Sequence, residues 1–469
     1  MLELIQSVNS AVNNFIWGVP AMICIIGVGL LLTFKTKFLQ IRKFPYAMKE
    51  TLGRVFKKQD ASDGSMTPFQ AVCTALASTV GTGNIAGVAG AIAIGGPGAV
   101  FWMWISAILG MCTKFSEVTL AVHFRERNQE GDYVGGPMYY IKNGLGKNWH
   151  FLAVLFSAFG VLTVFGTGNA TQVNTITTAI NSALLNFHVI SHSSVGTANL
   201  IIGIIVAILV ALILLGGIKR IGQVAERLVP FMAFIYIFFA LGVVVLNIDQ
   251  LPAVFGSIIN GAFHPASVTG GIVGSFFMSM KKGVARGIFS NEAGLGSAPI
   301  AAAAAQTKEP VRQGLVSMTG TFIDTIVICT MTGLSIVITE TWNTGLEGVA
   351  ITTAAFQKGL PFPPVVASFS LMLCLVFFAF TTILGWDYYG ERCLEYLFNR
   401  NKAAVTTYRW LYIICVFIGP YMTVAAVWNI ADIFNALMAF PNLIALLALS
   451  GVVVKETKDF FKRHKNYEF

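Results

Sequence analysis

The sequence predicts an all-α polytopic membrane protein with about eleven transmembrane helices, namely one N-terminal helix followed by two blocks of five. Its composition, its charge distribution and two interrupted helices indicate this fold class. Of 469 residues, 55% are hydrophobic and only 11% are charged, whereas a soluble domain carries about 25% charged residues. Apolar segments of about 20 residues, each long enough to cross roughly 30 Å of hydrocarbon, recur along the chain.

The first predicted span, 15–34, has no basic residue before it, so we expect a mature helix there rather than a cleaved signal peptide. Ten further spans follow from the apolar segments. They are predicted at 68–95, 98–123, 151–186, 197–217, 227–247, 268–305, 314–338, 362–388, 408–430 and 433–454.

The net charge of +9 comes from basic residues that are concentrated in some of the segments between the spans and absent from others. Eight Lys or Arg residues lie between Lys35 and Lys58, and five lie from Lys455 onward, whereas 1–14, 187–196 and 247–265 contain none. By the positive-inside rule, the N-terminus is outside and the C-terminus is cytoplasmic, which requires an odd number of spans. The pattern favours the plasma (inner) membrane of a prokaryote and argues against a nucleic-acid partner.

The seven cysteines are scattered singly and the six histidines form no cluster, so neither a disulfide framework nor a zinc site is indicated. The chain also lacks an HExxH motif, a Walker motif and a nucleophile elbow, and its loops are too short for a catalytic domain. The sequence therefore predicts that this protein is not an enzyme.

Two of the predicted spans are interrupted by glycine and polar residues, the first at 81–84 and the second near 287–292. Non-helical backbone at membrane depth is tolerated where it lines a cavity. Since each interruption opens a block of five helices, the second block enters the membrane with opposite orientation, as an inverted repeat does. The predicted divisions are 1–66 (first helix and basic cytoplasmic loop), 67–247 (first repeat), 248–265 (external loop), 266–455 (second repeat) and 456–469 (basic cytoplasmic tail).

The first interruption, Gly81-Thr82-Gly83-Asn84, predicts a binding site because packing alone does not call for the carboxamide of Asn84. Freed carbonyls of Ala77 and Val80 could replace the water around a cation, and the N–H groups of Thr82 and Gly83 could receive a carboxylate. A tight helix contact is the alternative. A dinucleotide loop is excluded, since no strand precedes the glycines.

Other polar residues within the spans have both a functional and a structural interpretation. Gln172 could bind a zwitterion or hold two helices together, and Thr381 and Thr382 could bind a hard cation or bond back to their own helix. Trp386 could wall a pocket or anchor at the interface. Asp324 is a functional candidate, or pairs with Arg286 or a lysine. Lys114 and Glu117 are spaced to pair on one helix face and are interpreted as structural.

The runs ASTVGTGNIAGV (77–88) and RGIFSNEAG (286–294) resemble the alanine/glycine:cation symporter family, and the resemblance covers essentially the whole chain. It implies co-transport of sodium with a small neutral amino acid, and a five-plus-five inverted repeat resembling the neurotransmitter:sodium symporters. The resemblance implies a sodium site made by Ala77, Val80, Thr381 and Thr382. It implies substrate-binding positions at Thr82, Gly83, Asn84, Gln172, Phe289, Asn291, Thr382 and Trp386.

Other functions compete with sodium-coupled uptake of alanine or glycine. A proton-coupled amino-acid permease of the same architecture would use Glu292 or Asp324 as its titrating group. A related symporter could prefer a larger amino acid such as glutamine. A channel or a membrane enzyme is a more distant alternative.

Overall fold

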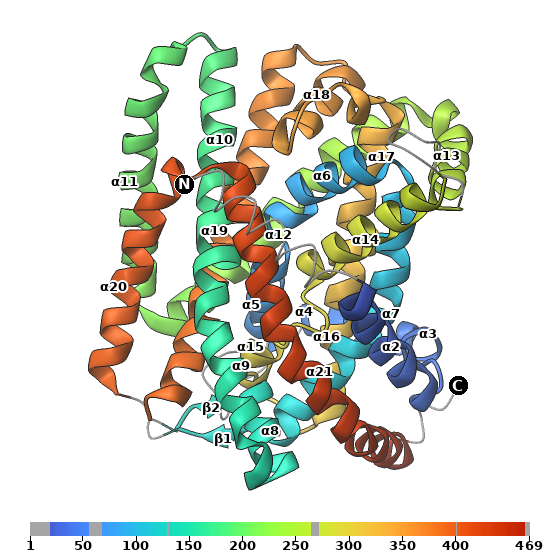
Figure 1. The fold of residues 1–469 in the computed structure, drawn as a ribbon, viewed down its shortest axis with the longest axis vertical. Helices are drawn as coiled ribbons and strands as arrows, with labels where there is room; N and C mark the ends of the chain where they lie inside the picture. The colour runs from blue at the N-terminus through green and yellow to red at the C-terminus, as the bar shows by residue number, and fades with distance from the viewer. Residues whose placement is uncertain (1–18, 56–67, 129–130, 264–271, 400, 465–469) are drawn as a thin grey trace.

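The computed structural model describes residues 19–55, 68–128, 131–263, 272–399 and 401–464, and most of them are helical (Figure 1). The part of the chain so described contains one antiparallel strand pair, β1 (Glu126–Arg127) with β2 (Tyr133–Val134). The N-terminal part forms α2 (Val19–Lys35), α3 (Leu39–Arg42) and α4 (Phe44–Val55).

Helices occupy all eleven predicted spans. In the first block they are α5 (Pro68–Thr79), α6 (Ala86–Gly95), α7 (Gly98–His123), α9 (His150–Thr163), a π-helical segment (Val164–Ala170), α10 (Thr171–Asn186), α11 (Val195–Leu214) and α12 (Gly217–Leu246). In the second block they are α14 (Ile272–Asn291), α15 (Ala298–Ala303), α16 (Pro310–Thr321), a π-helical segment (Phe322–Cys329), α17 (Thr330–Ile338), α19 (Pro364–Leu397), α20 (Lys402–Ile418) and α21 (Val424–Arg463). Among the described residues, eight continuous helices are long and apolar enough to cross a membrane, or nine if the bent pair α5 and α6 is one span.

The segment 248–265, predicted as an external loop, instead contains helix α13 (Leu251–Phe263). Its buried residues are Val254, Ile258 and Ala262, which recur every four positions and make one apolar helix face. Two further short helices lie between the spans, α8 (Pro137–Leu145) and α18 (Val349–Gly359). Each is too short to cross a bilayer, and for that reason the search for long apolar segments missed them.

The second interruption was predicted near 287–292, but α14 runs unbroken to Asn291 and the break lies at 292–297. Gly287 is a packing residue, since a Cβ there would lie 2.8 Å from Ser106 Oγ of α7. The backbone leaves the helix where Glu292, Gly294 and Gly296 take positive φ angles of 58°, 90° and 80°.

Helices of the two blocks pack against each other. The second helix of the first block, α7, packs along α16 of the second block, and α10 packs along α19. The α10–α11 connection, α13 and α18 lie toward the upper end of Figure 1, and β1, β2, α8 and the far part of α21 lie toward the lower end. The described connections without Lys or Arg (187–194 and 247–263) therefore share one end of the molecule.

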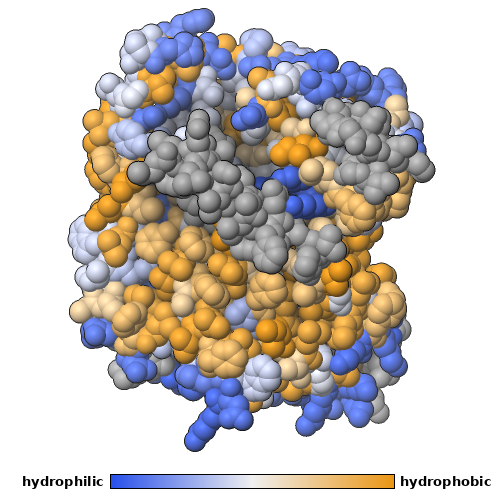
Figure 2. Space-filling view, viewed as in Figure 1, coloured by the Kyte–Doolittle hydropathy of each residue, from blue (hydrophilic) through white to orange (hydrophobic). Residues whose placement is uncertain are grey.

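The surface between these ends is apolar. Figure 2 shows a hydrophobic band across the middle of one face, with hydrophilic residues above and below it. Large side chains are exposed on the outer helices, including Phe234 (70% exposed) on α12 and Ile208 (54%) on α11. Such a surface requires an apolar solvent, and the chain is a multi-pass membrane protein.

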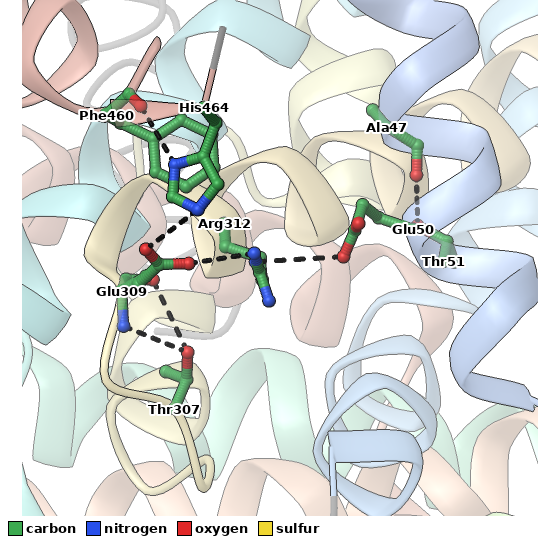
Figure 3. A network of polar contacts seen from close by, with 8 residues as sticks. All are labelled: Ala47, Glu50, Thr51, Thr307, Glu309, Arg312, Phe460 and His464. Atoms are coloured by element: carbon green, nitrogen blue, oxygen red, sulfur yellow. Dashed lines mark hydrogen bonds and ion pairs between the residues drawn. The ribbon is translucent and has the colours of Figure 1, made fainter. Parts of the chain in front are cut away.

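At one end of the bundle, ionic contacts join α4, α16 and α21 (Figure 3). Arg312 of α16 lies 3.0 Å from Glu309 and 3.8 Å from Glu50 of α4. His464, which follows α21, lies 3.4 Å from Glu309 and stacks on the ring of Phe460. Because these groups are partly exposed, each pair alone contributes little to the free energy of folding. Together the pairs connect three segments that are distant in the sequence.

Candidate functional site

The first helix break is a 3-10 turn, Thr82–Asn84, between α5 and α6, whose axes differ by 56°. Asn84 holds this turn, because its Oδ1 accepts a hydrogen bond from the Gly81 N–H at 2.8 Å. Gly81 lies against α19, where an added Cβ would be 2.5 Å from Thr382 Oγ1. A glycine at this position thus permits the broken helix to approach α19.

Four oxygen atoms meet where α5 ends beside α19. The hydroxyl of Thr382 lies 3.0 Å from the Ala77 carbonyl oxygen, 3.4 Å from that of Val80 and 2.9 Å from that of Phe378. A hydroxyl has one hydrogen to donate, so three carbonyl acceptors compete for it. An excess of oxygen ligands over hydrogens, buried at the end of a broken helix, is the environment that binds an alkali cation.

Thr381 joins this oxygen cluster only through a shared neighbour. Its hydroxyl lies 3.0 Å from the Phe378 carbonyl oxygen and 3.5 Å from the sulfur of Met232 on α12. The structure therefore places the Thr382 hydroxyl, but not that of Thr381, against the carbonyls of α5. The Phe378 carbonyl was absent from the sequence prediction because a backbone oxygen carries no side-chain signature.

Gln172 of α10 connects the first break to the π-helical segment 164–170. Its Oε1 accepts a hydrogen bond from the Thr82 N–H at 3.3 Å, and its Nε2 donates to the Thr167 carbonyl at 2.9 Å. The hydroxyl of Thr82 is buried and makes no hydrogen bond. The side-chain oxygen of Gln172 thus accepts a long hydrogen bond from the Thr82 N–H, and the same N–H could instead donate to a carboxylate.

Two aromatic side chains lie near the first break, Phe289 against Gly83 and Trp386 against the end of α5. A Cβ added to Gly83 would lie 3.0 Å from the Phe289 ring, so α14 touches the break there. Trp386 of α19 donates from its indole N–H to the Ser78 carbonyl at 3.2 Å and packs against Gly168. Both aromatic rings are almost fully buried.

Trp428, Arg286 and Asp432 cover Phe289 on the side where α14 and α21 begin, and we call these three residues the closed layer. The Phe289 and Trp428 rings lie 4.9 Å apart, and the Arg286 guanidinium carbon lies 4.5 Å from the centre of the Trp428 ring. Arg286 also forms a two-point ion pair with Asp432, both N···O distances being 2.9 Å. The expected alternative pairing of Arg286 with Asp324 is therefore wrong.

The carboxamides of Asn84 and Asn291 point into a separate polar cluster around Asp324. Asn84 Nδ2 donates to Asp324 Oδ1 at 2.7 Å, and Ser290 and Thr325 donate their hydroxyls to Asp324 Oδ2 at the same distance. Asn291 Nδ2 donates to Thr325 Oγ1 at 3.1 Å. Both asparagines thus tie the breaks to the π-helical segment 322–329.

The second break is held by Glu117 of α7. Its Oε1 accepts hydrogen bonds from the N–H groups of Gly294 (3.0 Å) and Gly296 (3.2 Å) and from Asn442 Nδ2 (2.6 Å). The spacing of Lys114 and Glu117 indicated a pair on one helix face. Lys114 is instead buried with its Nζ lacking a direct hydrogen bond, in electrostatic range of Glu292, Glu117 and Asp324.

Comparisons with known proteins show the family to which this chain belongs. The model of the sodium:alanine symporter family matches residues 2–468. An uncharacterised transporter of Haemophilus influenzae is 51% identical over 464 residues, covering 98% of this chain and 97% of its own. The sodium/alanine symporter AgcS of Methanococcus maripaludis is 44% identical over 474 residues, covering 99% of both chains.

Among solved structures, MhsT in complex with L-phenylalanine superposes with a TM-score of 0.57, covering 86% of this chain and 99% of its own. At 13% identity, this likeness speaks to the fold. The predicted fold class, a helical membrane protein resembling the neurotransmitter:sodium symporters, is confirmed.

Proposed function

Because this chain belongs to the sodium:alanine symporter family, we propose that it couples inward sodium movement to the uptake of alanine or glycine by alternating access. The chain is a transporter and not an enzyme. The sodium-coupled relative AgcS supports the choice of ion and substrate. Uptake measured without sodium and with an imposed proton gradient separates this mechanism from the competing proton-coupled one.

The oxygen cluster around Thr382 is the observation that carries this proposal. Sodium would be coordinated by a lone pair of Thr382 Oγ1, whose hydrogen would turn away, and by the carbonyl oxygens of Ala77, Val80 and Phe378. Thr381 could complete the shell by turning its hydroxyl away from Met232, since both hydroxyls already share the Phe378 carbonyl. The bound ion would then fasten α5 to α19.

The substrate would lie beside this ion, at the first break. Its carboxylate would take the N–H groups of Thr82 and Gly83, with Gln172 Oε1 giving way and the second hydrogen of Gln172 Nε2 donating to the substrate, while the first stays on the Thr167 carbonyl. Phe289 closes on Gly83 from one side, and Trp386 fills the space against Gly168 on the other. These close contacts leave room for a small side chain, which favours alanine and glycine over larger amino acids.

The orientation follows from the charge distribution. The end that carries the basic residues of α2–α4 and α21 would face the cytoplasm, with the N-terminus outside and the repeats at 67–247 and 266–455. The Arg286–Asp432 pair would then close the site from the outside.

One sodium ion per substrate is energetically sufficient. A tenfold sodium gradient and a potential of about 100 mV supply roughly 1.4 plus 2.3 kcal/mol. This drives a neutral zwitterion to accumulate roughly several hundred-fold.

We expect sodium-driven uptake of labelled alanine into proteoliposomes, with competition by unlabelled alanine and glycine but not by leucine or phenylalanine. The reason is the space that Phe289 and Trp386 occupy beside the break. Counterflow of unlabelled substrate distinguishes a transporter from a channel. Uptake that persists without sodium and follows an imposed proton gradient would overturn the sodium assignment, and strong competition by leucine would overturn the size argument.

Gln172→Ala is expected to weaken alanine binding more than folding. A lost hydrogen bond to a charged group costs about 1.5–3 kcal/mol, or roughly tenfold or more in affinity. The measurement is alanine binding in detergent together with the unfolding temperature. Asn174→Ala is the matched control, since Asn174 lies two positions further along α10 and its carboxamide bonds the carbonyls of Gly419 and Met422. If Gln172→Ala lowers stability as the control does and leaves affinity unchanged, Gln172 only joins helices.

A further inference from the structure

A basic pocket lies where the last turn of α2 and α3 meet the distal part of α21. It has a volume of about 390 Å³. Six of its lining residues are cations, and all its charged lining residues among those described are basic. The six cations are Lys35, Lys37, Arg42, Lys43, Lys458 and Lys462.

The positive-inside rule explains why cations lie at this end of the molecule, but it does not explain why six of them surround one cavity. Four come from the nine residues 35–43, which begin with the last residue of α2, and two come from α21, more than 400 positions later in the chain. The Nζ of Lys35 donates to the neutral hydroxyl of Ser450 at 2.7 Å, which fixes its position and leaves its charge for a ligand. Like charges held this close favour a bound anion.

The backbone beside the pocket is strained. Lys37 and Phe38 are consecutive residues with φ angles of 56° and 58°, in the left-handed region that non-glycine residues rarely enter. Two hydrogen bonds hold this turn, from the Phe38 N–H to the Thr33 carbonyl at 2.8 Å and from the Lys37 N–H to the Phe34 carbonyl at 3.0 Å. Strain of this kind persists where the surroundings hold it, and here it places Lys37 at the pocket.

The same turn carries large apolar side chains that face away from the protein. Phe34 is 63% exposed, Phe38 43% and Ile41 61%. The rings of Phe34 and Phe38 pack edge to face, with centroids 5.2 Å apart. Cations in a pocket and apolar side chains directly beside it match a molecule with an anionic head and hydrocarbon tails, at the level where the bilayer meets water.

We propose that this pocket binds the headgroup of an anionic phospholipid, whose acyl chains lie along Phe34, Phe38 and Ile41. The headgroup phosphate is held by the cations of α2, α3 and α21 together, and so it fastens the first helix to the last. Directly after the end of α21, His464 contacts Glu309 at the start of α16 (Figure 3). The lipid thereby completes the anchoring of α21, which also carries Asp432 of the closed layer.

The test uses the full chain purified in a neutral detergent. Phosphatidylglycerol or phosphatidylcholine is added, and retention is read by native mass spectrometry while stability is read as the unfolding temperature. We expect phosphatidylglycerol to be retained and to raise the unfolding temperature, and phosphatidylcholine to do neither. The quadruple variant Lys37→Gln, Arg42→Gln, Lys458→Gln, Lys462→Gln leaves Lys35 and Lys43 in place and should weaken retention roughly 100-fold.

A matched control removes four exposed cations elsewhere, by the changes Lys147→Gln, Lys219→Gln, Arg220→Gln and Lys402→Gln. This control should retain phosphatidylglycerol as the wild type does. Equal loss in both variants would mean unspecific attraction and would overturn the site. Stabilisation by glycerol 3-phosphate or inorganic phosphate equal to that by phosphatidylglycerol would overturn the lipid in favour of a free phosphate.

Discussion

Thr382→Ala is expected to lower sodium affinity by about 10- to 100-fold, because it removes the side-chain oxygen at the centre of the proposed cation site. The carbonyls of Ala77 and Val80 and the amides of the first break stay in place. Substrate binding without sodium should therefore remain weak but present. The measurement is alanine binding in detergent as a function of sodium concentration, followed by sodium-driven accumulation in proteoliposomes.

Sodium binding and alanine binding are thermodynamically linked, so the loss of sodium affinity should also appear in alanine binding. If sodium raises alanine affinity by some factor, alanine raises sodium affinity by the same factor. Thr382→Ser keeps the oxygen and should retain most of the coupling, whereas Thr381→Ala reports whether the second hydroxyl turns toward the ion. Thr382→Ala protein that binds sodium as tightly as Thr382→Ser would remove Thr382 from the site.

The two helix breaks show what glycine alone can and cannot predict. Gly81-Thr82-Gly83-Asn84 combines glycines with a side chain that bonds back to the turn, and the structure has its 3-10 turn there. At the second break, Gly287 looked equivalent but packs within a helix against Ser106. The chain turns five residues later, because the glycines that take positive φ angles are Gly294 and Gly296.

The candidate site was predictable where a side chain carries the chemistry. Thr382 and Gln172, to which the resemblance assigns binding roles, lie against the first break in the structure, and those roles stay predictions. Asn84 and Asn291 are instead engaged with the Asp324 cluster, and the Phe378 carbonyl emerges only from the packing of α19 on α5. These partners lie 34 and 240 residues apart in the sequence or on the backbone, so no local pattern marks them.

The spacing of Lys114 and Glu117 predicted a pair on one helix face and did not indicate the role of Glu117 at the second break. Replacing Glu117 is expected to have the other large effect, on stability. Its Oε1 receives three hydrogen bonds, two from the amides of Gly294 and Gly296 and one from Asn442. The side chain is fully buried. Glu117→Leu leaves the amides of Gly294 and Gly296 without an acceptor, leaves Asn442 Nδ2 with only the Gly294 carbonyl, and leaves Lys114 without one of its nearby carboxylates.

We therefore expect Glu117→Leu to lower the free energy of unfolding by about 3–5 kcal/mol, since removing one partner of a buried charged contact costs this much. The unfolding temperature in detergent and the yield of monodisperse protein measure it. Glu117→Gln keeps an acceptor oxygen for the break and should fall between Glu117→Leu and the wild type. Glu126→Leu, which breaks a partly exposed pair with Lys142, should cost about 1 kcal/mol or less. A Glu117→Leu protein as stable as the Glu126→Leu control would show that the second break keeps its shape without this carboxylate, and that the positive φ angles of Gly294 and Gly296 suffice.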